Sequence, residues 1–287
     1  MSYDFNIESP QTADELLAVI AANQDKNFRF GAGGTDLLLE LKRAPQENLT
    51  VVNLAQLKDP IFKSITKVAG GYRIGALVTA GEVLDHEEVK SEFYTLWEAA
   101  HNLASMQIRQ VATVGGNLCT ASPSGDIACA LVALHARCEI INTKGELRSV
   151  SVADFSTGVR KTVIQKNEVL RSVVVPINSN PNLHSGFIKV GTRLSMECSV
   201  VSLAYHIQMD DNRTIRHAGI AIGAVAPTIK FTDSACAFLI GKSKLIDTER
   251  EEFAGLISDY ASPISDVRAS AWYREEVLFN ISKGLME

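Results

Sequence analysis

Two glycine-rich segments carry the residue types best suited to hold a ligand through the backbone. The first runs from Phe30 to Leu37 (FGAGGTDL) and the second from Thr113 to Leu118 (TVGGNL). Because glycine has no Cβ and tolerates positive φ, such segments let backbone N–H groups approach another molecule closely. Free N–H groups at a helix N-terminus favour anions such as phosphate. Two such segments in one chain could hold the two halves of a single diphosphate.

The first segment is expected to join a strand at 28–30 to a helix at 36–43, with Thr35 as the helix cap. This arrangement would place free N–H groups and a helix N-terminus at one point, which suits a phosphate. An ordinary strand-to-helix turn explains the same residues. The spacing is not the fingerprint of a Rossmann fold, because Asp36 stands where the third glycine is required.

The second segment offers flexible backbone donors at Gly115 and Gly116 and an amide side chain at Asn117. Asp126 follows it, at the start of a nearly all-apolar helix predicted over 126–135. The carboxylate of Asp126 could accept hydrogen bonds from a ribose diol. The alternative is that Asp126 simply caps its own helix.

A lysine interrupts an otherwise apolar segment, Gly186–Val190, that is predicted to be a strand. Burying the ammonium group of this Lys189 costs free energy unless an anionic or polar partner compensates it. The polar edge of a bound ligand would be such a partner. The alternative is a lysine on the solvent face of an edge strand.

The composition excludes several classes of protein. The chain has 287 residues, a hydrophobic content of 46% and a formal net charge of −5, with no long run of either sign. A nucleic-acid binder would normally show a basic face, and neither the net charge nor the distribution of charges along this chain indicates one. No stretch approaches the ~20 apolar residues that a membrane span needs. The N-terminus has no basic n-region and no apolar h-region, so a cytoplasmic protein is expected.

No catalytic or metal-binding group is expected from the sequence. The five cysteines form no C-x-x-C pair and the six histidines show no ligand spacing, which disfavours a zinc or iron–sulfur site built from this chain alone. No Gly-x-Ser-x-Gly elbow is present. The segment Gly241–Ser243 is similar to the end of a P-loop, but Cys236 stands where that motif needs a glycine.

Hydrophobic patterns predict a small α/β unit followed by a larger one. The first covers about 1–56, with a helix at 10–22 that Thr12 caps and strands at 28–30 and 49–54. The second covers about 57–177 and has the following predicted elements: a hairpin of 61–68 and 71–74, helices at 79–84, 91–103 and 126–135, and strands at 138–142, 146–150 and 169–175.

An Asn/Pro-rich segment, 176–182, is the predicted boundary between domain 1–177 and a C-terminal α+β domain, 183–287. The elements predicted in this domain are strands at 186–190, 199–208 and 219–224 and helices around 247–259 and 268–283.

With both glycine segments in place, the chain resembles the FAD-binding medium subunit of the molybdenum hydroxylases. This family includes xanthine dehydrogenase, aerobic carbon monoxide dehydrogenase and nicotinate dehydrogenase. The resemblance covers nearly the whole chain and rests on Ala32–Leu37, Thr113–Leu118, Ala121–Asp126 and Lys189–Arg193 in this order. It implies an α+β fold: a vanillyl-alcohol-oxidase-type FAD-binding domain of two α/β subdomains, and a small C-terminal α+β domain of the carbon-monoxide-dehydrogenase flavoprotein type.

The resemblance also implies which residues bind FAD. Both glycine segments would clasp the diphosphate, Asp126 would bind the ribose, and Lys189 and Leu170 would lie by the isoalloxazine ring. Some relatives stack an aromatic side chain on the adenine, where this chain has Leu103. The implied cofactor-binding residues are Phe30, Gly31, Ala32, Gly33, Gly34, Thr35, Asp36, Leu37, Leu103, Thr113, Gly115, Gly116, Asn117, Asp126, Leu170 and Lys189.

The function implied by this resemblance is electron transfer within a multi-subunit oxidoreductase of the xanthine dehydrogenase type. The FAD of this chain would take electrons from a 2Fe–2S iron–sulfur subunit and pass them to NAD or another acceptor. A separate molybdopterin-containing large subunit would oxidise the substrate. Two alternatives remain open: a stand-alone flavoenzyme on the same fold, and a flavin-free assembly or binding protein.

Overall fold

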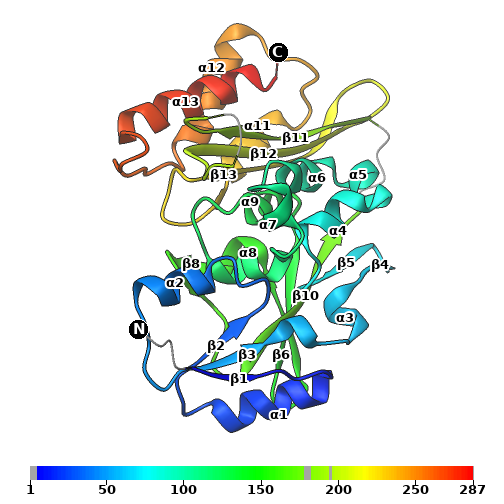
Figure 1. Ribbon diagram of the computed structural model, residues 1–287. Coiled ribbons are helices and arrows are strands. Elements are labelled where there is room, and N and C mark those ends of the chain that lie inside the picture. The colour runs from blue at the N-terminus through cyan, green and yellow to red at the C-terminus, as the bar shows by residue number, and fades with distance from the viewer. Residues whose placement is uncertain (1–4, 178–181, 194–195, 287) are drawn as a thin grey trace.

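A computed structural model of the chain describes residues 5–177, 182–193 and 196–286, and in these residues the chain folds around three larger sheets (Figure 1). The first sheet is parallel, with the order β1-β3-β2. Its strands and helices are β1 (Asn6–Glu8), α1 (Ala13–Asn23), β2 (Phe28–Gly31), α2 (Leu37–Arg43) and β3 (Thr50–Asn53). The side chain of Thr12 accepts a hydrogen bond from the N–H of Glu15, so the predicted cap of α1 is confirmed.

The second sheet is antiparallel, with the order β4-β5-β10-β6-β7. Its strands are β4 (Ile65–Val68), β5 (Gly71–Gly75), β6 (Arg137–Asn142), β7 (Leu147–Ser151) and β10 (Glu168–Pro176). The helices before and between these strands are η1 (Leu54–Gln56), α3 (Pro60–Lys63), α4 (Ala80–Asp85), α5 (Glu87–Glu92), α6 (Tyr94–His101), α7 (Met106–Arg109), α8 (Val114–Thr120), α9 (Asp126–Ala133) and α10 (Val152–Phe155). A small hairpin of β8 (Ser156–Gly158) and β9 (Lys161–Thr162) precedes β10.

The third sheet is antiparallel and belongs to the C-terminal part of the chain. Its strands, in spatial order, are β11 (Asn182–Val190), β12 (Val201–Met209), β13 (Ile215–Gly223) and β14 (Lys230–Phe231). One face is covered by α11 (Asp233–Leu239), α12 (Asp247–Ser258) and α13 (Ala271–Gly284), which lie at the top of the molecule in Figure 1.

Helices α6 and α9 lie between the second and third sheets and join them into one core. Buried side chains of both sheets, such as Ile74 and Phe187, meet those of α9 in a single hydrophobic cluster. The backbones approach closely at Gly219 of β13, where a Cβ would lie 2.0 Å from the carbonyl oxygen of Ala133 in α9. The predicted apolar helix over 126–135 is confirmed as α9, which is buried along its whole length.

The structure corrects three of the predicted elements. Residues 60–63 form the helix α3 instead of part of a strand, because Asp59 caps a turn that begins with a proline. The single helix predicted over 91–103 is broken at Phe93, which leaves helical geometry and is buried between α5 and α6. The third sheet's β13 begins earlier than predicted, at Ile215. Most of the Asn/Pro-rich segment predicted as the domain boundary, 176–182, lies outside the described residues.

A polar cluster in the second sheet predicts how acid affects stability. The carboxylate of Glu139 accepts hydrogen bonds from Arg73 at 2.8 Å and Ser172 at 2.5 Å, and Arg171 lies 3.4 Å away. The hydrogen bond from Arg73 is the main reason why the pKa of Glu139 falls from 4.5 to about 2.

Because the pKa of Glu139 is lower in the folded chain, its contribution to stability is complete above pH 4.5 and is lost as the pH falls towards 2. Replacing Glu139 by glutamine is therefore expected to lower the free energy of unfolding at pH 7 and to flatten its pH dependence between these values. Urea unfolding at a series of pH values measures both effects. The exposed Glu275, changed in the same way, should leave the profile unaltered; equal profiles for the two variants would contradict the prediction.

Candidate functional site

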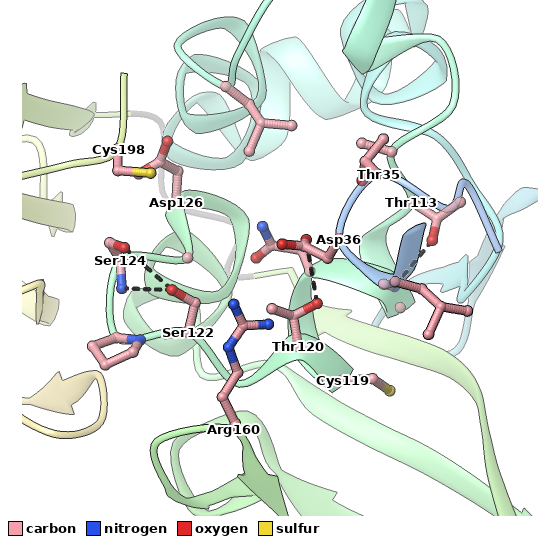
Figure 2. A pocket seen from close by; sticks show the side chains of 18 of the residues that line it. Thr35, Asp36, Thr113, Cys119, Thr120, Ser122, Ser124, Asp126, Arg160 and Cys198 are labelled. Carbon is pink, nitrogen blue, oxygen red and sulfur yellow. Dashed lines mark hydrogen bonds between the residues drawn. The ribbon is translucent and has the colours of Figure 1, made fainter. Parts of the chain in front are cut away.

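One large cavity gathers almost all of the predicted site residues. Its volume is about 1250 Å³, and its walls come from the first glycine segment, α8, α9, β10, β11 and the C-terminal loop that contains Ser262 and Arg268. Figure 2 shows Thr35 and Asp36 on one side of this space and Asp126 on another. Among the predicted residues, only Gly31 is not part of the wall. It is packed against Val51 instead.

The first glycine segment presents unused backbone donors to the cavity. Among the described residues, no partner accepts a hydrogen bond from the N–H of Gly33, Gly34, Thr35 or Asp36. The segment is pressed against the loop before α8: a Cβ on Gly33 would lie 1.8 Å from the carbonyl oxygen of Val111. Only glycine fits at that position. The close approach of the first glycine segment to the loop before α8 therefore depends on Gly33.

The predicted cap of α2 is wrong. The residue that precedes the helix is Asp36 rather than Thr35, and no side-chain hydrogen bond caps the first turn. Asp36 is not in the extended conformation usual for a capping residue, having φ −98° and ψ −48°. In the first turn of α2, the N–H of Leu38 donates to the carbonyl oxygen of Gly34 instead of to a capping side chain.

The second glycine segment is the first turn of a helix, α8, and not an open turn. Thr113 caps it, because its hydroxyl oxygen accepts a hydrogen bond from the N–H of Gly116 at 3.0 Å. The N–H groups of Val114 and Gly115 donate to the carbonyl oxygens of Val78 and Ala76. The expectation of free backbone donors at Gly115 and Gly116 is therefore wrong.

Asn117 supplies the polar group that the second segment turns towards the cavity. Its Oδ1 accepts a hydrogen bond from the N–H of Ala128 in α9, at 3.0 Å. Among the described residues, its Nδ2 has no hydrogen-bond partner, and the residue lines the cavity. This amide group is a donor that a bound anion or hydroxyl group can use.

A buried ion pair forms another part of the wall. The Nζ of Lys189 lies 2.6 Å from the Oδ2 of Asp126 and 3.0 Å from the carbonyl oxygen of Asn102. The side chains of Lys189 and Asp126 are only 12% and 4% exposed. The hydroxyl group of Ser199 donates to the Oδ1 of Asp126 at 2.6 Å. Burial raises the pKa of Asp126, and the Lys189 ammonium group opposes this rise.

This geometry decides between the alternatives for both residues of the ion pair. Asp126 is the first residue of α9 and its side chain makes no capping hydrogen bond, so it does not simply cap the helix. Lys189 is not a solvent-facing lysine, because it is held by Asp126. Both side chains face the cavity with part of their hydrogen-bonding capacity free, which allows them to contact a polar ligand.

Apolar side chains complete the wall. Leu170, which is 3% exposed, belongs to β10, and Leu103 follows α6. Other apolar residues that line the cavity are Phe30, Ala32, Leu54, Leu77, Ile108 and Val169. Pockets for flat ring systems combine apolar walls of this kind with a few placed polar groups.

Sequence reasoning missed several polar residues of the wall. Arg29 and Arg160 both contact Glu40, and Ser199 holds Asp126. Nothing local marks Arg160 or Ser199, because their partners lie far away in the chain. The hydroxyl groups of Ser122 and Ser124 are 3.2 Å apart beside the cavity (Figure 2), within a stretch that the resemblance did include.

No group of three or more His, Cys, Asp or Glu side chains in the part of the chain that the structure describes could hold a metal ion. None of the helices formed by those residues has the length and apolar character that crossing a membrane requires.

The cavity fits an extended dinucleotide such as FAD. Its volume exceeds the ~300–1,000 Å³ typical of pockets for small ligands. Unused N–H groups at one point suit a phosphate, the Asp126 carboxylate and the Asn117 amide suit hydroxyl groups, and the apolar walls suit rings. The missing Cβ of Gly33 is what allows the walls to approach each other here.

Comparisons with known proteins also indicate an FAD-binding chain. Residues 3–178 match the FAD binding domain in molybdopterin dehydrogenase, and residues 187–285 match the CO dehydrogenase flavoprotein C-terminal domain. The nicotinate dehydrogenase FAD-subunit of Eubacterium barkeri is 26% identical over 98% of this chain and 95% of its own length. The xanthine dehydrogenase FAD-binding subunit of Escherichia coli O157:H7 is 30% identical over 69% of this chain and 66% of its own length.

The fold is also shared with a solved structure. A chain of the carbon monoxide dehydrogenase from Hydrogenophaga pseudoflava superposes with a TM-score of 0.89, over 98% of this chain and 95% of that one, at 23% identity. The expected α+β fold of the carbon-monoxide-dehydrogenase flavoprotein type is confirmed. Because the match to the FAD binding domain alone covers more than half of the residues, the chain belongs to the family of FAD-binding subunits of the molybdenum hydroxylases.

Proposed function

We propose that this chain is the electron-transfer subunit of a xanthine dehydrogenase-like assembly, taking electrons from a 2Fe–2S subunit and passing them to NAD or another acceptor. One observation carries the proposal: both glycine segments and the buried pair of Asp126 and Lys189 face the same continuous cavity. The relatives named as FAD subunits of nicotinate and xanthine dehydrogenases support it. The match to the FAD binding domain in molybdopterin dehydrogenase supports a molybdopterin-containing large subunit as the second partner. We also propose a cytoplasmic location.

Each part of the wall has a proposed role towards FAD. When bound, FAD supplies the redox chemistry by accepting and delivering electrons. The N–H groups of the first glycine segment and the Nδ2 of Asn117 would bind its diphosphate, and Asp126 would accept hydrogen bonds from hydroxyl groups. Lys189 would donate to the polar edge of the isoalloxazine ring, with Leu170 packed beside the ring. We propose domain limits of 1–177 and 183–287, which the two family matches support.

Mixing the FAD-loaded chain with NADH in the absence of oxygen tests the proposed acceptor. If NAD is the physiological partner, NADH should bleach the visible flavin band by the reverse reaction. If the reduced 2Fe–2S subunit bleaches the band and NADH does not, the electron-transfer role stands, and the acceptor is a molecule other than NAD. A band that neither donor bleaches would contradict the proposed function.

A gain of affinity is expected at Leu103. This side chain lines the cavity and is partly exposed, at the position where some relatives stack an aromatic ring on the adenine. An aromatic pair contributes about 0.5–1.5 kcal/mol beyond the area that it buries. Leu103→Phe should therefore tighten FAD binding by about two- to tenfold, as measured by titration of flavin fluorescence. Leu54→Phe is the control, because Leu54 is another apolar residue of the wall and is not expected to contact the adenine. Equal gains of affinity in both variants would contradict the placement of Leu103 beside the adenine.

A further inference from the structure

A cluster of three charged side chains lines one side of the cavity. The carboxylate of Glu40 in α2 accepts hydrogen bonds from the Nη2 of Arg29 at 2.9 Å and the Nη1 of Arg160 at 2.6 Å. Arg29 lies in β2, within the same sheet unit as α2, whereas Arg160 lies on the hairpin of β8 and β9, 120 residues away in the chain. The contact between Glu40 and Arg160 therefore joins two separate parts of the cavity wall.

The backbone fixes Arg160 at this place. The N–H of Arg160 donates a hydrogen bond to the carbonyl oxygen of Ala121 at 3.0 Å, and Ala121 ends α8. Both residues adopt positive φ, 60° for Arg160 and 45° for Ala121, although neither is glycine. Such residues are strained and persist where the surroundings impose them, often beside a functional site.

The same two walls carry the two glycine segments. Helix α2 directly follows the first segment, and α8 begins with the second. Beside the first segment, Gly33 packs against the backbone at Val111. Further along, the ion pair of Glu40 and Arg160 connects α2 to the β8–β9 hairpin, whose Arg160 N–H is bonded to Ala121 at the end of α8. A weaker contact of 3.5 Å joins Asp36 and Thr120 directly. Figure 2 shows the guanidinium group of Arg160 directed towards Asp36 and Thr120.

We propose that the ion pair of Glu40 and Arg160 is a latch that controls how fast FAD enters and leaves the cavity. The pair joins the two walls between which the diphosphate would lie, so the walls can separate only when it breaks. Its side chains are 34% and 50% exposed, which makes the pair weak enough to open and sensitive to salt. Arg160 is thus a positioning residue that acts on the cofactor through Glu40 and α2.

Stopped-flow measurement of flavin fluorescence, with the full chain, gives the rates of FAD binding and release. A latch that is closed with and without FAD slows both rates, so Arg160→Ala should raise both. An exposed ion pair contributes about 0.2–1 kcal/mol, which corresponds to roughly 1.4- to fivefold in each rate. The equilibrium dissociation constant should change by less than about twofold, and added salt should accelerate the unaltered chain towards the variant.

Arg216→Ala is the control, because it also removes one arginine and an exposed ion pair, with Asp210, in the C-terminal part of the chain and away from the cavity wall. It should leave both rates unchanged. Equal acceleration by Arg216→Ala would show that lost positive charge, and not the latch, matters. A faster release with unchanged binding would show that Arg160 contacts FAD directly. Either result, or no change in Arg160→Ala, would overturn the proposal.

Discussion

Replacing Gly33 by alanine is expected to lower the affinity for FAD by at least about 100-fold. The added Cβ would lie 1.8 Å from the carbonyl oxygen and 2.6 Å from the carbonyl carbon of Val111, which are backbone atoms that cannot rotate away. The first glycine segment must therefore move away from the start of α8, and its N–H groups leave their places on the cavity wall. A loss of this size corresponds to about 3 kcal/mol, within the range of severe single substitutions.

Titration with FAD measures this loss, and circular dichroism checks that the fold remains. Gly255→Ala is the matched control, because Gly255 lies in α12 and a Cβ there would meet nothing within 4 Å. It should bind FAD like the unaltered chain. Tight FAD binding by the Gly33 variant would show that the approach of the two segments does not matter for the cofactor.

Replacing Asp126 by alanine is expected to lower both FAD affinity and the stability of the chain without FAD. The change leaves the Lys189 ammonium group, whose side chain is 12% exposed, with the carbonyl oxygen of Asn102 as its one remaining partner among the described residues. Removing one member of a buried ion pair typically costs about 3–5 kcal/mol. Urea unfolding of the FAD-free variant should show a decrease of this order in the free energy of unfolding.

The double variant Asp126→Ala with Lys189→Met separates stability from cofactor binding. Without a buried unpaired charge, much of the lost stability should return, whereas FAD binding should remain weak because the polar groups are gone. If the double variant is as unstable as the Asp126 variant alone, the unpaired lysine is not the cause. If it binds FAD normally, neither side chain belongs to the cofactor site.

Much of the fold follows from local patterns. The buried helix α9 is predictable because nearly all of its residues are apolar, and the hairpin between β6 and β7 follows from the turn at Lys144-Gly145. The first turn of α8 was not predictable. Glycine disfavours helices, and this one forms because Thr113 caps it and the carbonyl oxygens of Ala76 and Val78 accept its first N–H groups.

The candidate site was predictable as far as it rests on short motifs. The glycine segments, Asn117 and Asp126 are visible in the sequence, and every predicted cofactor-binding residue lines the cavity except Gly31. The pairing of Asp126 with Lys189 was not visible, because the two residues are 63 positions apart and lie on different elements. The same holds for Arg160 and Glu40, whose contact depends on the placement of a hairpin against α2. Sequence motifs identify groups that can bind FAD, but the tertiary fold decides which of them meet.

The most direct test of the account is the visible spectrum of the purified chain after incubation with FAD and removal of the excess. Denaturation should then release a cofactor that chromatography identifies as FAD. We expect flavin absorbance and a nearly stoichiometric content of FAD in the unaltered chain. In the Gly33→Ala variant, the FAD content should be much lower. A chain that releases no FAD on denaturation, both alone and when purified together with its 2Fe–2S partner subunit, would contradict the assignment of the cavity as an FAD site.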